Sequence, residues 1–375
     1  ALLPDPQLAR DIFPLILELS LFALPLLSLR LTDWETPRWF TFLFFVFCIF
    51  NFYTFQAILT ASPVLLLGLL YAGMLLALRT GQDELLGALL AVSLYYWEVG
   101  LPFLLLIVWR SYKERRTRVF AGFFMLSFVM LAVSFLFYPN WLLPYLQAGM
   151  NNLRADFGFT IFNAFTDLFP SFGRLLAWVV VVILILAFGS EWNTAQSAEH
   201  STDDRRFYWL ACLSLAVAPL LGFRTELEHL VVLVIPLALI FSIVYDRWRR
   251  FGGGLTFLLL LAVLGVPWAL YVFVLPRFGL APQVIFLFPP LILGPLVGAA
   301  SPARLGGFGI QPIIGRMSFR TYLLLFLSGL ILPIVIAQFQ PVPGYLDSAY
   351  YFAGGVQLAE GKGFTEPYLW NYLDG

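Results

Sequence analysis

Residues 119–138, VFAGFFMLSFVMLAVSFLFY, decide the fold of this chain. No charged side chain occurs in this stretch. An α-helix rises about 1.5 Å per residue, so roughly 20 apolar residues cross a hydrocarbon core about 30 Å thick. A cluster of positive residues directly precedes the stretch: Arg110, Lys113, Arg115, Arg116 and Arg118. The sequence therefore predicts a transmembrane helix that begins beside a basic loop.

The composition of the whole chain agrees with this prediction. Of its 375 residues, 61% are hydrophobic and only 12% are charged, whereas about 25% are charged in typical soluble proteins. The 22 Lys and Arg residues balance the 22 Asp and Glu residues, which disfavours a nucleic-acid partner. Cys48 and Cys212 lie inside apolar runs and form neither a disulfide framework nor a metal cluster. We expect an all-α, polytopic integral membrane protein that lies in the lipid bilayer.

About ten apolar runs of this kind occur along the chain. One of them, 85–109, contains Glu98 and Pro102, and it is either one span or two half-helices that meet at Glu98. An eleventh run, 280–299, is interrupted by prolines. The ten runs are 12–29, 39–58, 62–78, 85–109, 119–138, 174–189, 207–222, 227–245, 255–275 and 321–339.

The orientation of the spans follows from the loops that are rich in Lys and Arg, because cytoplasmic loops retain these residues. Such loops occur at 110–118, 247–250 and 304–320. Counting spans outward from each of the three gives the same orientation, and 190–206 then also lies in the cytoplasm as a loose polar loop. The segments that this counting places on the opposite, external side are 139–173, 223–227, 276–279 and 340–375.

The predicted external segment 139–173 combines apolar, aromatic and polar residues. Its apolar residues suffice for short helices that lie in the membrane interface. The simpler interpretation is an aromatic belt at the level of the lipid headgroups. The polar and charged residues of the segment include Asn151, Asn152, Arg154, Asp156, Asn163 and Asp167.

Residues 341–375, PVPGYLDSAYYFAGGVQLAEGKGFTEPYLWNYLDG, form a second informative stretch. The predicted span 321–339 leads into them at the external face, where Pro and Gly residues stop the helix. Asp347 follows close to the membrane boundary, and a carboxylate there is suited to deprotonate a substrate hydroxyl. The structural alternative is that Asp347 caps the helix that follows it.

This stretch resembles the first external loop of the GT-C superfamily, which comprises polytopic glycosyltransferases that use polyprenyl-phosphate-linked sugars, including the family 39 and family 87 types. The resemblance rests on a span, a Pro/Gly turn, Asp347, the pair Tyr350-Tyr351 and the motif Ala-Glu-Gly-Lys-Gly-Phe at 359–364. It implies that Asp347 is the general base that takes the proton of the acceptor hydroxyl. We also expect Tyr350 to contact the substrate and Lys362 to help stabilise the departing phosphate.

A weaker resemblance covers residues 10–245, which look like the later spans of a family 87-like enzyme. It rests on Gly81-Gln82 before an apolar helix, on the break around Glu98 and on Arg224-Thr225-Glu226 at the start of a span. That family often has Lys-Pro near the broken helix, whereas this chain has Trp97-Glu98.

Three residues near the external end of the span 227–245 are candidate substrate ligands: Arg224, Glu226 and His229. The planar guanidinium of an arginine can engage two phosphate oxygens at once. His229 adds a donor if it is protonated. The alternative is that Arg224 pairs with Glu226 or Glu228 and extends to the interface.

The two resemblances occur in the reverse of the order expected for one enzyme. We therefore expect a fragment that joins parts of two such enzymes and is inactive by itself, with a bimodular protein or a permuted enzyme as the alternatives. Residues 1–316 would be a transmembrane bundle that resembles the later spans of a GT-C enzyme. Residues 317–375 would be one transmembrane helix and the first external loop of a second module, starting at Met317. Asp347 and Arg224 would then belong to different active sites.

These observations together predict a membrane glycosyltransferase, with the bacterial plasma membrane as its location and an active external face. It would move a sugar from a polyprenyl-phosphate carrier to a hydroxyl of a lipid, glycan or protein acceptor, with inversion. No pair of carboxylates has convincing metal-ligand spacing, so the sequence does not decide between a metal-dependent and a metal-independent reaction, and a divalent metal is the one cofactor left open. The alternative function is a transporter or flippase of a lipid-linked or amphipathic substrate, because broken spans line transporter sites.

Overall fold

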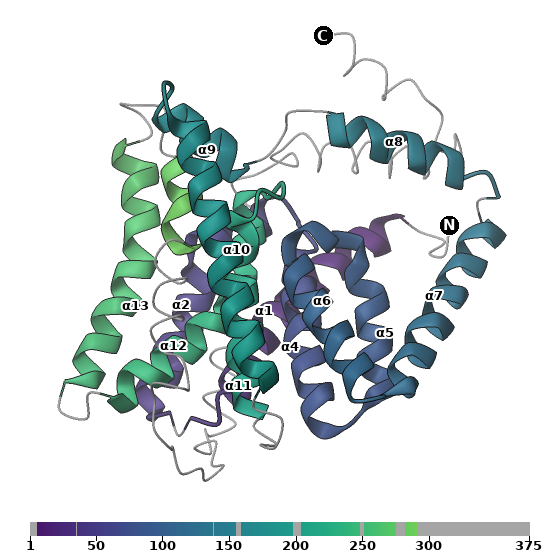
Figure 1. Ribbon diagram of the computed structural model, residues 1–375, viewed down its shortest axis with the longest axis horizontal. Helices are drawn as coiled ribbons and strands as arrows, with labels where there is room; N and C mark the ends of the chain where they lie inside the picture. Colours follow the sequence, from purple (N-terminus) through teal and green to yellow (C-terminus); the bar gives the residue numbers. More distant parts are fainter. Residues whose placement is uncertain are drawn as a thin grey trace.

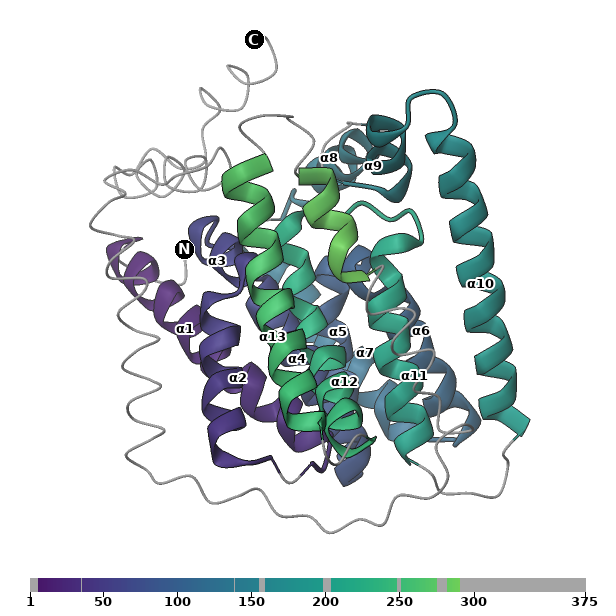
Figure 2. The ribbon, with the colours of Figure 1, turned by 90° about the vertical axis from the view of Figure 1, so that its left-hand side faces the viewer.

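The computed structural model describes residues 6–34, 36–137, 139–154, 159–197, 204–247, 251–274 and 282–290. This part of the chain is helical throughout, apart from loops and one isolated antiparallel bridge between Phe159 and Thr225. Most of the helices run side by side along one direction, as Figures 1 and 2 show. The prediction of an all-α bundle is therefore confirmed for the described residues.

Helices follow one another closely along the chain, with short connections between most of them. They are α1 (Pro6–Leu31), α2 (Arg38–Phe50), α3 (Phe52–Leu59), α4 (Val64–Thr80), α5 (Asp83–Ser93), α6 (Trp97–Lys113), α7 (Thr117–Phe137), α8 (Leu142–Arg154), α9 (Ile161–Leu168), α10 (Gly173–Ser197), α11 (Asp204–Val217), α12 (Val234–Arg247) and α13 (Gly252–Ala269). Short helical turns join or extend them: η1 (Leu94–Tyr96), η2 (Ala218–Leu220), η3 (Leu227–Leu233) and η4 (Leu270–Val274). A further helix covers 282–290.

Five helical stretches in the described residues are long and apolar enough to cross a membrane. A sixth results if α2 and α3, which are bent by 45° at a short break, count as one span. The break falls at Asn51, whose backbone is extended and whose side-chain Oδ1 accepts a hydrogen bond from the N–H of Tyr53. The five stretches are Asp83–Lys113, Thr117–Leu136, Gly173–Trp192, Leu227–Asp246 and Gly252–Phe273. The chain is thus a multi-pass membrane protein.

The stretch Asp83–Lys113, which includes the predicted run 85–109, turns back on itself. Arg116, just beyond the end of α6, donates to the Asp83 carboxylate at 3.1 Å and to the Leu78 carbonyl at 3.2 Å. The two ends of the stretch therefore lie at the same end of the bundle, as Figure 1 also shows. The structure supports two helices here, with the reversal at η1 rather than at Glu98. A second irregularity, the non-helical backbone of Gly100, lies inside α6.

Two glycines allow α5 to lie directly against α7. A Cβ on Gly87 would collide with the carbonyl oxygen of Val119, and one on Gly122 would collide with the carbonyl of Glu84. Small residues permit such close backbone contact between membrane helices. The pair Gly87 and Gly122 thus fixes the position of α7, whose other faces are largely exposed.

Ion pairs hold together the end of the bundle at which α6 joins α7, which we call the basic end. Arg79 pairs with Asp33 at 2.6 Å, and Arg116 pairs with Glu114 at 2.6 Å as well as with Asp83. Partial burial acts to lower the pKa of Arg116, but the carboxylates of Glu114 and Asp83 outweigh it and raise that pKa.

The ends of α10 and α12 and the starts of α11 and α13 also lie at the basic end, whereas α8 and α9 lie at the opposite end (Figure 2). We call this opposite end the α9 end. The positive residues at 110–118, the end of α10 at Ser197 and the end of α12 at Arg247 are thus grouped as the count of spans predicts. The prediction of a loose loop over 190–206 is wrong for 190–197 and 204–206, which are helical. The predicted spans and loops beyond residue 290, and the boundary at 316, lie outside the described residues.

Candidate functional site

The three described candidate residues lie in and after an extended segment, 222–226, at the α9 end. Gly222 has a φ of +89°, a conformation that favours glycine, and a Cβ at this position would collide with the ring of Phe162. Thr225 then exchanges two backbone hydrogen bonds with Phe159, with N–O distances of 2.8 and 2.9 Å. These contacts hold the partly buried Arg224 beside the start of α9.

Glu226 and His229 cap the first turn of η3. The backbone N–H of Glu226 donates to Nδ1 of His229 at 3.1 Å, and the Glu226 side chain accepts from the backbone of His229. Because Nδ1 accepts a hydrogen bond, the imidazole is neutral and its proton is on Nε2. His229 is buried, with its ring 5.4 Å from that of Tyr96. It offers one N–H donor rather than a positive charge.

Glu228 is the buried carboxylate of this segment. Its side chain is 8% exposed, and the hydroxyl of Thr60 donates to its Oε1 at 3.5 Å. Sequence reasoning treated Glu228 only as a partner for Arg224. The Glu228 side chain instead points toward the end of α3, where Thr60 is the C-terminal cap of the helix.

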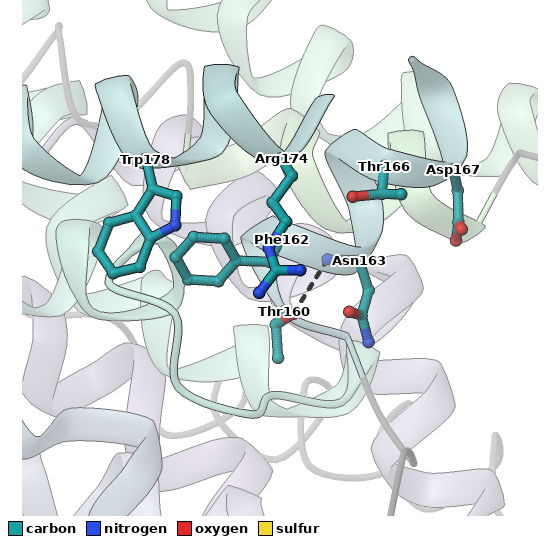
Figure 3. Close-up of a pocket in the computed structure, with 7 residues that line it drawn as sticks. All are labelled: Thr160, Phe162, Asn163, Thr166, Asp167, Arg174 and Trp178. Atoms are coloured by element: carbon teal, nitrogen blue, oxygen red, sulfur yellow. Dashed lines mark hydrogen bonds between the residues drawn. The ribbon is translucent and has the colours of Figure 1, made fainter. Parts of the chain in front are cut away.

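A cavity of about 570 Å³ lies between α9 and α10, close to the segment 222–226. Figure 3 shows Arg174 and Trp178 descending from α10, with the ring of Phe162 next to Trp178. The two ring centroids are 4.9 Å apart. The cavity is lined by Thr160, Phe162, Asn163, Thr166, Asp167, Arg174 and Trp178.

The corner between α9 and α10 gives the cavity its shape. Thr160 caps α9, because its hydroxyl oxygen accepts from the N–H of Asn163 at 3.1 Å. At the other side of the corner the N–H of Gly173 donates to the carbonyl of Phe169 at 2.7 Å, and a Cβ at Gly173 would collide with the carbonyl of Phe165. Only a glycine at 173 lets α10 begin this close to α9.

The polar groups of the cavity have different environments. Asp167 accepts a hydrogen bond from Gln283 at 2.8 Å, so α9 is tied to the helix at 282–290. Arg174 is exposed and has no ion pair with any residue that the structure describes. In Figure 3 its guanidinium extends toward Thr160 and Asn163. A cation, an amide and hydroxyl groups therefore face the same space.

The cavity and the segment 222–226 form one continuous region. Phe162 contacts Gly222 on one side and Trp178 on the other. The ring of Phe223 in turn lies 5.9 Å from that of Trp97 at the start of α6. Arg224 and Arg174 thus belong to the same end of the bundle and to neighbouring elements.

Sequence reasoning found part of this region. It grouped Arg224, Glu226 and His229, and it noted Asn163 and Asp167. It missed Arg174, which it counted as the first residue of the predicted span 174–189. A positive residue at the predicted external end of an apolar run, directly after a turn, is the signal that could have identified it.

The remaining predictions lie elsewhere. Asp347, Tyr350 and Lys362 are outside the described residues.

Glu98 is partly exposed in the first turn of α6, just before the irregular Gly100. The hydroxyl of Tyr71 lies against Gly100 and has no hydrogen-bond partner within the described chain. No group of three His, Cys, Asp or Glu residues in that part of the chain could hold a metal ion.

Comparison with protein-family models, with curated proteins and with solved structures gives no match for this chain.

Proposed function

We propose that this protein is a membrane glycosyltransferase that uses a polyprenyl-phosphate-linked sugar. Support comes from the position of Arg174 at the top of α10. Below it α10 presents a continuous exposed apolar face, made of Leu175, Val179, Val182, Ile183 and Leu186. An isoprenoid chain lying along this face would bring its phosphate to the depth of Arg174.

The cavity has groups that suit a phosphate and a sugar. Arg174 can make charge-assisted hydrogen bonds to phosphate oxygens. Asn163 and Asp167 can bond to sugar hydroxyls, and the exposed ring of Trp178 offers an apolar surface. Its volume of about 570 Å³ is in the range of small-molecule sites.

The resemblance of 341–375 to GT-C enzymes supplies the chemical step. Asp347 would take the proton from the acceptor hydroxyl, the oxygen would attack the anomeric carbon, and the polyprenyl phosphate would leave with inversion. In the module that holds Asp347, Tyr350 would contact the substrate and Lys362 would stabilise the charge that develops on the phosphate. Arg224, Glu226 and the Nε2–H of His229 would bind the substrate phosphate in the module formed by residues 1–316.

The proposal includes finer features that are expectations from the sequence. These are ten or eleven spans in a GT-C-like arrangement and a bacterial plasma membrane with the α9 end facing outward. They also include the division into 1–316 and 317–375, under which Asp347 would serve a second module. A divalent metal would be an optional cofactor.

Sugar transfer by the purified full-length gene product tests the proposal. A radiolabelled polyprenyl-phosphate sugar is supplied with a membrane extract as the source of acceptors, and labelled product is measured. Asp347→Asn should abolish transfer, whereas Asp374→Asn, the same change in the same stretch, should retain it. Equal activity of the two variants would contradict the role of Asp347.

The second candidate, a transporter or flippase of a lipid-linked substrate, is favoured by the bend between α2 and α3 and by the irregular backbone at Gly100. Reconstitution into vesicles separates the two functions. A flippase moves a fluorescent polyprenyl-phosphate lipid between leaflets without consuming the sugar, and it does so without an acceptor.

A further inference from the structure

A cluster of cations at the basic end has no role in the proposed sugar transfer. Two carboxylates lie within reach of the connection between α6 and α7: Glu114 in the connection itself and Asp83 at the start of α5. Arg110 donates to Glu114 at 2.6 Å, and Arg116 engages both carboxylates. These four residues balance one another in charge.

Three further cations, in or next to this connection, have no carboxylate partner among the described residues. Lys113, Arg115 and Arg118 are exposed, and within the described ranges none of them has an ion pair. Arg115 has a φ of +54°, and its carbonyl accepts from the N–H of Thr117 at 2.9 Å, so the loop has a defined shape. The three positive charges occupy six consecutive positions of the chain.

Aromatic side chains place this cluster at the boundary of the bilayer. Lys113 lies over the ring of Trp109 at 5.5 Å, and Trp109 packs against Trp192 of α10 at 4.8 Å. Arg110 lies over the ring of Phe207 at 4.2 Å, and Tyr112 is exposed. Tryptophan and tyrosine favour the headgroup level of membranes.

The neighbouring helix faces lipid. The helix α7 follows the cluster directly. Only 11% of its apolar stretch is buried inside the protein. Phe124 and Phe128 are among its exposed side chains. A lipid whose acyl chains lie along α7 therefore has its headgroup beside Arg118 and Arg115.

We propose that Lys113, Arg115 and Arg118 bind the headgroup of an anionic phospholipid in the leaflet at the basic end. The phosphate of the lipid accepts hydrogen bonds from the guanidinium groups, and its acyl chains pack on α7. A neutral zwitterionic lipid binds more weakly, because its own ammonium group opposes the cluster.

Native mass spectrometry of the purified full chain tests this site, with phosphatidylglycerol and phosphatidylcholine of equal chain length as probes. The wild type should bind phosphatidylglycerol more tightly. Arg115→Gln/Arg118→Gln should weaken that binding about 30-fold, since each cation near a membrane surface contributes roughly fivefold. Phosphatidylcholine binding should stay unchanged.

The matched control is Arg30→Gln/Arg38→Gln, which removes the same charge from exposed residues near Asp33, at the same end of the bundle. This control should bind phosphatidylglycerol like the wild type. If both double variants lose the same share of phosphatidylglycerol binding, the attraction is general and the proposed site is wrong. The site is also wrong if neither double variant loses binding. Arg115→Lys/Arg118→Lys keeps the charge and should retain most of the binding, which distinguishes lost binding from misfolding.

Discussion

Nδ1 of His229 accepts a hydrogen bond from the backbone N–H of Glu226 at 3.1 Å. This arrangement is a capping box in which histidine takes the place usually held by glutamate or glutamine. It fixes the imidazole tautomer and directs the single N–H donor away from the helix terminus. The local backbone thus determines what His229 can offer to a ligand.

Replacement of His229 by leucine should destabilise the protein. The N–H of Glu226 would lose its acceptor, at a cost of about 1 kcal/mol. His229→Gln should retain the cap, because a glutamine side chain at this position can accept the same hydrogen bond. Thermal unfolding in detergent measures both, and the cap has no such role if the two variants unfold at the same temperature.

Gly87→Ala should separate α5 from α7. The added methyl group meets the carbonyl of Val119 and the N–H of Phe123, neither of which can move without shifting α7, so we expect a loss of about 2 kcal/mol. Gly265→Ala in α13 is the control, since a Cβ at that position would have no other atom within 4 Å. A helix-interior alanine there should be neutral or stabilising. Thermal unfolding that ranks the two variants in the opposite order would contradict the packing.

Arg116→Gln should loosen the basic end. The change removes the ion pairs with Glu114 and Asp83 and the hydrogen bond to Leu78, and we expect a cost of about 1–2 kcal/mol because the group is only partly exposed. Arg30→Gln, on an exposed arginine without an ion pair in the described chain, should leave stability unchanged. Denaturation in detergent compares the two variants.

Arg174→Gln should weaken binding of a fluorescent polyprenyl phosphate about 10- to 100-fold, because charge-assisted hydrogen bonds to the phosphate are lost. Arg174→Lys should retain part of the affinity, since a lysine keeps the charge but not the bidentate geometry. Binding to the purified protein is measured by fluorescence anisotropy. If glutamine and lysine have the same effect, the positive charge of Arg174 is not what holds the phosphate.

The reversal between α5 and α6 predicts that Gln82 and Arg115 are on the same side of the membrane. Single cysteines at these positions should react with an impermeant maleimide from one side of oriented vesicles, and a cysteine at Tyr145 in α8 should react from the other. Cys48 and Cys212 are buried and should remain unlabelled. Labelling of Gln82→Cys and Arg115→Cys from opposite sides would mean that Asp83–Lys113 is a single span.

Most of the fold follows from patterns that the sequence displays. Uncharged stretches such as 119–138 become helices because a bilayer leaves no other partner for the backbone. The reversal at Leu94–Tyr96 does not show in such a pattern, since apolar residues continue through the turn. Glu98 and Pro102 predict a break at Glu98, a few residues after the reversal that the structure has at Leu94–Tyr96.

The site was partly predictable for a similar reason. Arg224 and His229 are polar residues at the end of an apolar run, so they are conspicuous. The cavity instead depends on the corner at Gly173, which joins the neighbouring helices α9 and α10, and on the bridge from Phe159 to Thr225, which joins segments more than 60 positions apart. A long-range contact such as this bridge leaves no local signature in a single sequence. The role of Asp347 stays a prediction.

The helix α5 has consequences for how the protein enters its membrane. It contains 11 residues and is therefore about 16 Å long, roughly half the thickness of the hydrocarbon core. Such a segment cannot be stably inserted alone as it leaves the ribosome. We therefore expect α5 to enter the membrane only together with α6, after residue 113 has been synthesised.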